Sequence, residues 1–398
     1  MTDSELREAA ARTGTPAYIF DLDEARTRAG AVRAMLGGGI GLCFAMKSNP
    51  FLTGALASCV DRIECCSVGE FRIAAAQSVP PEKILFSGVL KTEEDIAEVM
   101  DRCGARCLYT AESPAQFCML EEAAARRGIR VRVLLRLTGG NQFGMAFGDL
   151  MPLYEAAETS DAVSIAGIHF FTGTQKHFAP IRKELKTLGE RMDEIRSRGW
   201  PVPELEYGPG FPVRYFEQER EPLREDDVRE TVRLAGALGA GRVTFEMGRF
   251  LAASCGVYLT KILDLKRGEE PDAPAICITD GGIHQIQYDG QFRGMFTPEI
   301  RVLRERPDAA EAKTGLYTLC GSLCTANDVL CGKYAASGLR PGDLLAFGRT
   351  GAYSAFEGMA LFLSHDLPAV ALRSAEEGLR VVRDRQPTWI LNTYTQKG

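Results

Sequence analysis

The sequence predicts an α/β chain in which a parallel (β/α)8 barrel is followed by a mostly β domain. Three observations point to this architecture. About eight short apolar strands alternate with helices as far as Glu246, which is the rhythm of a barrel of parallel strands. After Arg249 this rhythm stops, and β-like segments separated by Gly, Pro and Asp turns begin. A length of 398 residues is enough for two such domains.

Hydrophobic periodicity locates the elements of the barrel. The expected strands are residues 41–46, 62–66, 83–87, 106–110, 130–137, 163–171, 204–207 and 242–246. The expected helices are residues 23–36, 52–60, 69–77, 92–102, 114–127, 150–159, 178–197 and 226–238. A further strand, residues 16–22, precedes the barrel. The second half is expected to hold strands at residues 256–266, 275–279, 315–320 and 343–347, and a charged surface loop at residues 301–314.

Composition excludes several classes of protein. The net charge of -6 and the absence of a long basic run argue against nucleic acid or a membrane surface as partner. The sequence has no apolar run of about 18 residues and a polar start at Met1–Thr15, so we expect no membrane span, no secretory signal and a cytoplasmic location. The 12 cysteines lack metal-ligand spacing and histidines number only 4, which predicts reduced thiols and no metal site.

Lys47 is the first candidate for chemistry, since it lies at the carboxyl end of a short apolar strand within Cys43–Pro50. An unpaired buried ammonium is very costly, so such a lysine must be paired or used chemically. One interpretation is a Schiff-base lysine that holds pyridoxal 5'-phosphate (PLP). The other is a lysine that simply reaches solvent at the end of a strand.

Other candidates also stand where strands end. Gly208–Gly210 lets backbone N–H groups approach an anion such as a phosphate, although a plain turn would have the same residues. Glu246 is either a catalytic carboxylate or the ion-pair partner of Arg249. Tyr353 follows an apolar strand and either packs or binds. Cys324, in the polar loop 321–328, is either inert or reactive.

Taken together, these segments resemble the fold-type III PLP-dependent decarboxylases, the group of diaminopimelate, ornithine and arginine decarboxylases. The similar motifs follow the order of the family and cover nearly the whole chain. They are Tyr18–Leu22, Phe44–Pro50, Ser67–Glu70, Gly167–Gln175, Gly208–Phe211, Glu246–Arg249, Asp280–Gly282, Gly321–Cys324 with Asp328, and Pro341–Asp343 through Gly351–Tyr353. The resemblance implies an alanine-racemase-like (β/α)8 barrel at 29–250, a C-terminal mostly β domain at 251–398, and an N-terminal segment, 1–28, that joins the β domain.

The resemblance also implies roles by position. Lys47 would carry PLP, and Glu246 would keep the pyridine nitrogen protonated. Cys324 would reach the active site of a partner subunit and donate a proton, which implies a homodimer with shared sites. Thr325 and Asp328 would contact the substrate. The implied cofactor contacts are Lys47, Glu70, Arg136, His169, Phe171, Thr174, Gly208, Gly210, Glu246, Gly248, Arg249 and Tyr353.

Three positions depart from the family pattern. Phe171 stands where decarboxylases of free diamino acids have a histidine that stacks on PLP. Thr325 stands where they have an acid for the distal ammonium of the substrate, and residues 362–368 lack the late Tyr and Arg of diaminopimelate decarboxylases. A neutral residue gives a cationic tail no charge partner. We therefore expect a substrate with a neutral or masked tail, as in the branch that acts on a glutamyl thioester of an acyl carrier protein.

The sequence leaves three other activities open. One is a diaminopimelate- or ornithine-type decarboxylase of free amino acids. Another is an amino-acid racemase on the same fold, although the Lys47–Pro50 motif differs from that of racemases. The last is a binding homologue without catalysis, against which the retention of Lys47, Glu246 and Tyr353 argues.

Overall fold

The computed structural model describes residues 1–219, 223–268, 270, 273–304 and 314–394. The chain divides into two compact units. The barrel unit comprises Arg26–Val213 and Glu221–Leu251. The β unit comprises Met1–Ala25, Arg214–Arg220 and Ala252–Gly398. The expected limits at 28/29 and 250/251 differ by a few residues from these divisions, and the expected barrel 29–250 also includes Arg214–Arg220, which belongs to the β unit.

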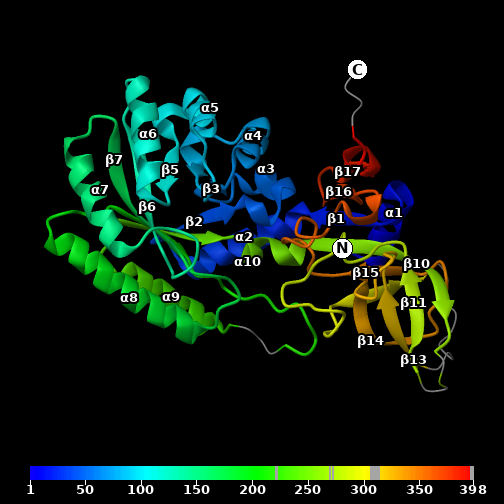
Figure 1. Ribbon diagram of the computed structural model, residues 1–398. Helices are drawn as coiled ribbons and strands as arrows, with labels where there is room; N and C mark the ends of the chain where they lie inside the picture. Colours follow the sequence, from blue (N-terminus) through cyan, green and yellow to red (C-terminus); the bar gives the residue numbers. More distant parts are fainter. Residues whose placement is uncertain (220–222, 269, 271–272, 305–313, 395–398) are drawn as a thin grey trace. The chain divides into compact units, whose positions relative to one another are not determined.

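The barrel unit confirms the predicted fold class. Its strands are all parallel and close into a barrel in the order β2 to β9, with β9 pairing back to β2 through Phe245 and Leu42 (Figure 1). The strands are β2 (Ile40–Ala45), β3 (Arg62–Cys65), β4 (Ile84–Phe86), β5 (Leu108–Ala111), β6 (Val131–Leu137), β7 (Val163–Phe171), β8 (Glu204–Gly208) and β9 (Arg242–Met247). The carboxyl ends of these strands share one face, where active sites of such barrels lie.

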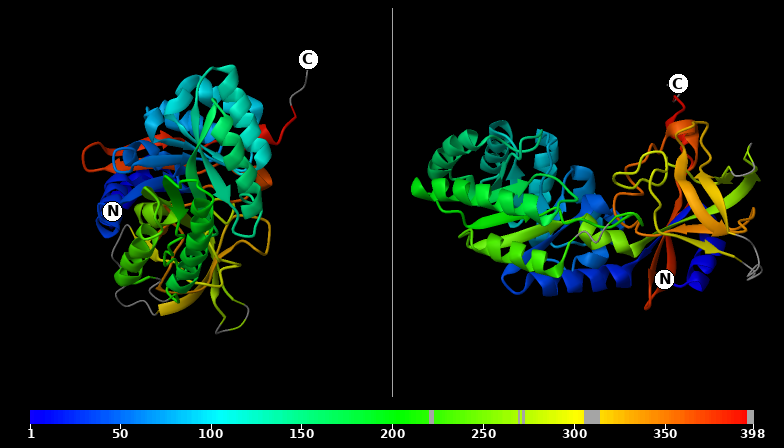
Figure 2. Two further views of the ribbon diagram at one scale, coloured as in Figure 1. Left: turned by 90° about the vertical axis from the view of Figure 1, so that its left-hand side faces the viewer. Right: turned by 90° about the horizontal axis from the view of Figure 1, so that it is seen from below.

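Helices surround the barrel strands, and α8 and α9 pack side by side on its outside (Figures 1 and 2). Side chains of Ser67, Thr92 and Ser113 cap the helices that follow them. The helices are α2 (Leu22–Leu36), α3 (Thr53–Leu56), α4 (Val68–Ala76), α5 (Glu93–Cys103), α6 (Pro114–Arg126), α7 (Phe147–Thr159), α8 (Phe178–Ser197), α9 (Glu225–Gly236) and α10 (Arg249–Ala252). None of the described helices combines the length and apolar character that a bilayer crossing requires.

One barrel helix is shorter than predicted. The expected helix 52–60 is reduced to the 3₁₀ turn Pro50–Leu52 and the single turn α3. Gly54 lies inside α3, and Ser58 follows it. Both residue types favour helices weakly, so the apolar spacing alone overestimated the helix.

The β unit contains a nine-stranded sheet among its described residues. The central path runs β14-β13-β11-β10-β1-β16-β17, and β15 joins β10 to β12. The strand expected at 16–22 is β1, which pairs with both β10 and β16. The strands are β1 (Ala17–Asp21), β10 (Gly256–Lys266), β11 (Ala275–Thr279), β12 (Ile300–Leu303), β13 (Thr314–Cys320), β14 (Val329–Ser337), β15 (Leu344–Phe347), β16 (Ala369–Ser374) and β17 (Gly378–Arg383).

The prediction of a surface loop at 301–314 is wrong at both ends of this segment, where the structure has strands. Residues 301–303 belong to β12, which pairs with β15 and buries Leu303. Thr314 begins β13. Residues 305–313 lie outside the described residues. The charges of this segment masked the strand, because Leu303 is one of few apolar residues that mark its buried face.

The N-terminal helix α1 (Asp3–Thr13) was not predicted. Thr2 and Glu5 form a capping box at its start. Leu6 and Ala9, one turn apart, pack into a core cluster with Ile19 and Leu259 of the sheet. The polar composition of this segment therefore conceals a narrow apolar stripe.

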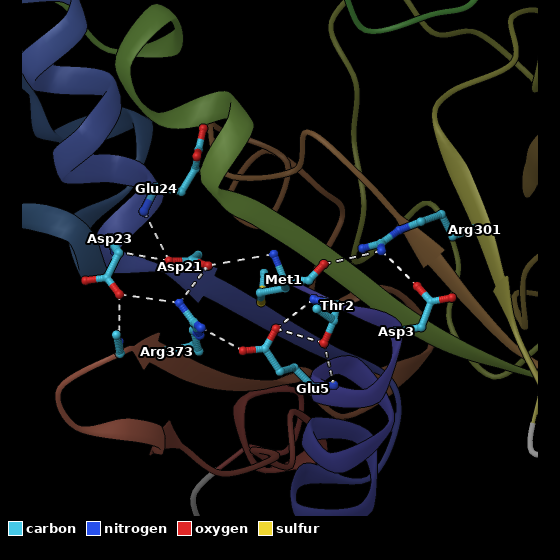
Figure 3. Close-up of polar contacts among 10 residues, drawn as sticks. Met1, Thr2, Asp3, Glu5, Asp21, Asp23, Glu24, Arg301 and Arg373 are labelled. Carbon is cyan, nitrogen blue, oxygen red and sulfur yellow. Dashed lines mark hydrogen bonds and ion pairs between the residues drawn. The ribbon is translucent and has the colours of Figure 1, made fainter.

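Arg373 links three elements of the β unit (Figure 3). Its guanidinium lies 2.6 Å from Glu5 of α1, 3.4 Å from Asp21 of β1 and 3.3 Å from Asp23. We call these four residues the Arg373 network. The backbone N–H of Thr2 and the Arg373 guanidinium together lower the pKa of Glu5 to about 2. The network therefore ties the N-terminal helix to the sheet.

Candidate active site

Lys47 lies just beyond β2, in the 3₁₀ turn Met46–Ser48, at the carboxyl face of the barrel. Its Nζ is 2.8 Å from Glu64 Oε2 on β3 and 3.7 Å from Glu246 Oε1 on β9. The other oxygen of Glu246 is 3.0 Å from His169 Nε2 on β7. We call these four residues the Lys47 cluster. Parallel strands bring together side chains that are up to about 200 positions apart, since all strand ends meet on one face.

Burial differs sharply within the Lys47 cluster. The Lys47 side chain is 33% exposed, whereas those of Glu64, His169 and Glu246 are at most 4% exposed. Burial by itself would raise the pKa of Glu64, but Lys47 and His169 outweigh it and lower the pKa. The amine is thus paired with buried carboxylates while the side chain stays partly exposed, which argues against a lysine that merely reaches solvent.

Glu64 is a site residue that the sequence reasoning missed. The signal was an acid in the apolar strand Arg62–Cys65, where an ionised side chain needs a partner. Glu246 was predicted, and one suggested partner for it was Arg249. The structure instead places Glu246 against Lys47 and His169.

The predicted phosphate-binding glycines adopt tightly packed backbone. A Cβ on Gly210, where φ is +65°, would overlap the carbonyl oxygen of Gly173. A Cβ on Gly208 would overlap the ring of Phe171. Only glycine fits at these positions, because a side chain would collide with Gly173 or with Phe171. Nearby, Arg249 Nε donates to Thr174 Oγ1 over 3.3 Å, with Gly248 directly before Arg249.

Three more predicted cofactor residues belong to the same barrel unit. The Phe171 ring centroid is 5.9 Å from Lys47 Nζ. Arg136 is buried and lies 2.8 Å from Glu112, another acid that was not predicted. Glu70 accepts the backbone N–H of Cys66 over 2.6 Å, and burial raises its pKa. Cys66 Sγ is 3.5 Å from Lys47 Nζ, which connects Glu70 to the cluster.

Glu64, His169 and Glu246 have ligand-type atoms within 4.8 Å of one another, close enough for a metal ion. The ammonium of Lys47 already supplies a positive charge to both carboxylates. We therefore assign this cluster to the lysine. A lysine nitrogen beside a buried acid, together with a glycine turn near Arg249, fits an aldehyde cofactor that carries a phosphate.

The remaining predicted residues belong to the β unit. Cys324 is exposed and Thr325 is half-buried in the turn Gly321–Asp328. Asp328 is buried, and its two oxygens accept the backbone N–H groups of Ile283, over 2.8 Å, and Leu323, over 2.7 Å. Both hydrogen bonds hold the turn that carries Cys324. Tyr353 has a φ of +64° in the segment after β15.

Comparisons with known proteins agree on one family. The family model for the pyridoxal-binding domain of pyridoxal-dependent decarboxylases matches residues 22–253. A diaminopimelate decarboxylase of Pseudomonas aeruginosa is 31% identical over 87% of this chain and 85% of its own length. An L-glutamyl-[BtrI acyl-carrier protein] decarboxylase of Niallia circulans is 27% identical over 94% and 92%, respectively.

A solved structure shares the fold. Diaminopimelate decarboxylase from Helicobacter pylori, in complex with L-lysine, has a TM-score of 0.83 at 21% identity, over 97% of this chain and 99% of that one. The family match contains the whole Lys47 cluster and the glycine turn. The cofactor is therefore PLP, and the chain belongs to the pyridoxal-dependent decarboxylases.

Proposed function

We propose that this decarboxylase acts on an amino acid whose side chain ends in a neutral or masked group, such as a glutamyl group on a carrier protein, in a specialised biosynthetic pathway. The observation that carries the proposal is the turn Gly321–Asp328. Asp328 is its one acidic residue, and backbone N–H groups engage both carboxylate oxygens. Thr325 is neutral. The turn thus offers no carboxylate to a cationic tail.

Charge explains why this matters for specificity. A buried ammonium that lacks its partner loses about 3–5 kcal/mol relative to a paired one. Each 1.4 kcal/mol is a factor of ten, so the penalty corresponds to at least about a hundredfold. The Thr325 hydroxyl can donate one hydrogen bond and accept others, which suits an amide, a thioester carbonyl or a hydroxyl.

The residues of the barrel unit have distinct tasks in this reaction. Bound PLP supplies an electron sink for the charge that remains after loss of carbon dioxide. Lys47 supplies the amine that holds the cofactor, and Glu64 fixes its position. Glu246 holds a proton at the ring nitrogen, and His169 fixes the second oxygen of Glu246. Phe171 would pack on the ring, and Glu70 and Arg136 would line the site. The phosphate would be bound by Thr174, Gly208, Gly210, Gly248 and Arg249.

The β unit would complete the site in a homodimer. Cys324 is the proton donor to the substrate carbon in this proposal, and its exposure leaves the thiol accessible to a partner subunit. Tyr353 adds a phosphate contact. Asp328 is a positioning residue for the turn rather than a substrate contact.

A second candidate is decarboxylation of free diaminopimelate. The relative from Pseudomonas aeruginosa favours it, since that diaminopimelate decarboxylase is 31% identical. The relative from Niallia circulans favours the carrier-bound glutamyl group. Both activities belong to one family, so only the substrate separates them.

A substrate panel tests the proposal. The wild type is incubated with diaminopimelate, lysine, ornithine, and free and carrier-bound glutamate, and carbon dioxide release is measured. We expect turnover of the substrate with the masked tail at least about a hundredfold above that of the diamino acids. Thr325→Glu should shift the preference toward diamino acids. A wild-type kcat/KM of about 10⁴ M⁻¹s⁻¹ or more for diaminopimelate or ornithine contradicts the proposal.

Hybrid dimers test the shared sites. Lys47→Ala and Cys324→Ala proteins are each inactive in this account. Random mixing should restore about a quarter of wild-type activity, because half of the dimers are hybrids with one of two sites intact. Absence of recovery despite demonstrated subunit exchange argues against sites shared between subunits.

A further inference from the structure

Three polar side chains form a row inside the barrel, next to the Lys47 cluster. His169 on β7 is the register partner of Glu206 on β8, and Glu206 is the register partner of Thr244 on β9. Partners on parallel strands project to the same side of the sheet. His169 bonds to Glu246 and Glu206 bonds to Arg62, so this side is the barrel interior. All three residues of the row are at most 1% exposed.

Each residue of the row has an atom without a hydrogen-bond partner in the described part of the chain. These atoms are His169 Nδ1, Glu206 Oε1 and Thr244 Oγ1. Buried polar atoms almost always have partners, so three such atoms on neighbouring strands need an explanation. Gly41 on β2 pairs with Thr244 and contributes no side chain, and a Cβ there would lie 2.9 Å from Thr244 Oγ1. Glycine thus keeps space beside the row.

We propose that the barrel interior binds a water molecule between His169 Nδ1, Glu206 Oε1 and Thr244 Oγ1, and that Glu206 acts through this water on the His169–Glu246 pair. Buried waters typically make about three hydrogen bonds to otherwise unpaired groups. The Thr244 hydroxyl donates a hydrogen bond to the water. When Glu206 is ionised, the water donates one hydrogen bond to His169 Nδ1 and one to Glu206 Oε1; when Glu206 is protonated, its Oε1 donates to the water instead, so all three atoms gain a partner in either state.

Several charged groups surround Glu206. Arg62 Nη1 on β3 lies 2.6 Å from Glu206 Oε2, and the same guanidinium also contacts Glu204 of β8. Cys43 on β2, Glu64 on β3, His169 on β7 and Glu246 on β9 complete this environment. Burial raises the pKa of Glu206 to about 7; Arg62 opposes this rise and the like charge of Glu246 adds to it. Glu206 therefore changes charge near neutral pH.

The water connects that charge to Glu246. A proton that leaves Glu206 passes to the water, which passes one of its own protons to His169 Nδ1. The imidazole then releases its Nε2 proton to Glu246 Oε2, 3.0 Å away. One proton leaves Glu206 and one arrives at Glu246, so the charge balances. Glu206 is thus a positioning residue, which sets the charge on the carboxylate that faces the cofactor ring.

The inference rests on the proposed role of Glu246, but its test needs no amino-acid substrate. High-resolution crystal structures of the full-length chain should show a water within hydrogen-bond distance of all three atoms in the wild type and in Thr244→Ser. Thr244→Val should lose it. Thr231→Val is the matched control, because Thr231 is equally buried in α9 and donates to Asp227 O over 2.7 Å.

Equilibrium titration with PLP at a series of pH values supplies the second measurement. Wild type, Thr244→Ser and Thr231→Val should show a step in the PLP dissociation constant near pH 7, where Glu206 titrates. The step should be about tenfold for each unit by which PLP binding moves the pKa of Glu206. Glu206→Gln should abolish the step, and Thr244→Val should shrink it.

Either measurement can overturn the proposal. A wild-type structure without this water contradicts it, and so does a pH step that survives in Glu206→Gln. A water without any pH step contradicts the coupling. Neither measurement uses an amino-acid substrate, so a negative result in the substrate panel would not affect them. Failure of the proposed substrate class can therefore be distinguished from failure of the buried-water proposal.

Discussion

Two clusters of charged side chains, the Lys47 cluster of the barrel unit and the Arg373 network of the β unit, each gather carboxylates around one cation. They differ in burial. The Lys47 cluster has carboxylates that are 1% and 4% exposed. The Arg373 network has three carboxylates: Glu5 and Asp23 are 36% and 37% exposed, and Asp21 is 8% exposed (Figure 3).

This difference in burial separates the roles of the clusters. Breaking a buried ion pair costs about 3–5 kcal/mol, because one charge stays without a partner in a poorly solvated place. An exposed pair contributes about 0–1 kcal/mol. Breaking an ion pair of the Lys47 cluster, at the face where chemistry occurs, should therefore cost more free energy of folding. Breaking one of the Arg373 network, which joins α1 to the sheet, should cost less.

Lys47→Ala should have the largest effect. We expect carbon dioxide release to fall roughly 10³-fold or more, since the residue that holds the cofactor is lost. The variant should also lose about 3 kcal/mol of folding free energy at neutral pH, because Glu64 stays buried without its cation.

The pH dependence of stability sharpens this prediction. In the wild type the pKa of Glu64 lies below its ordinary value of 4.5, so its contribution is present above that pH and is lost as the pH falls through the lowered pKa. Without Lys47, burial raises the pKa, and the folded variant binds protons more readily than the unfolded chain. Chemical denaturation should show the variant regaining stability as the pH falls from 7 toward 4.5. Parallel profiles for both proteins would contradict the pairing.

Glu246→Gln should have the next largest effect. The amide preserves the shape and can still bond to His169, but it cannot hold a charge opposite the ring nitrogen. We expect kcat to fall about 10²–10³-fold, the size of effect seen when one preorganised electrostatic contact is lost. Unfolding by urea should change little. An unchanged kcat would show that Glu246 does not act on the cofactor.

Arg373→Ala should have the smallest effect. Folding free energy should fall by about 1 kcal/mol at neutral pH, with carbon dioxide release within twofold of wild type. Because Glu5 has a pKa of about 2 in the fold, against an ordinary 4.5, its contribution is present above 4.5 and is lost as the pH falls toward 2. The stability gap between variant and wild type should narrow over that range. A loss of several kcal/mol of folding free energy in Arg373→Ala would contradict the distinction between the two clusters.

Strong periodicity made much of the fold predictable. The predicted bounds of β7, α8 and β10 agree with the structure because these elements carry regular apolar patterns. Segments with few apolar residues were missed. Of these, α1 buries only Leu6 and Ala9. The strand β14 was missed for another reason: it is largely apolar, but Gly332 interrupts its pattern.

Prediction of the site depended on the distance between partners in the sequence. Lys47 and Glu246 were recognisable because each closes an apolar strand. Glu64 and Glu206 lie within strands. Their partners, Lys47 beyond β2 and Arg62 on β3, come from other parts of the barrel, so local sequence could not reveal the pairing. Asp328 likewise accepts a hydrogen bond from the backbone N–H of Ile283, 45 residues away, so local sequence could not reveal this contact.

Chemical trapping of the cofactor tests the central claim most directly. The purified protein is treated with borohydride, which makes a lysine-bound cofactor permanent, and its peptides are mapped by mass spectrometry. We expect a pyridoxyl group on Lys47, the lysine that lies between Glu64 and Glu246. A pyridoxyl group on another lysine, or none after incubation with PLP, would contradict it.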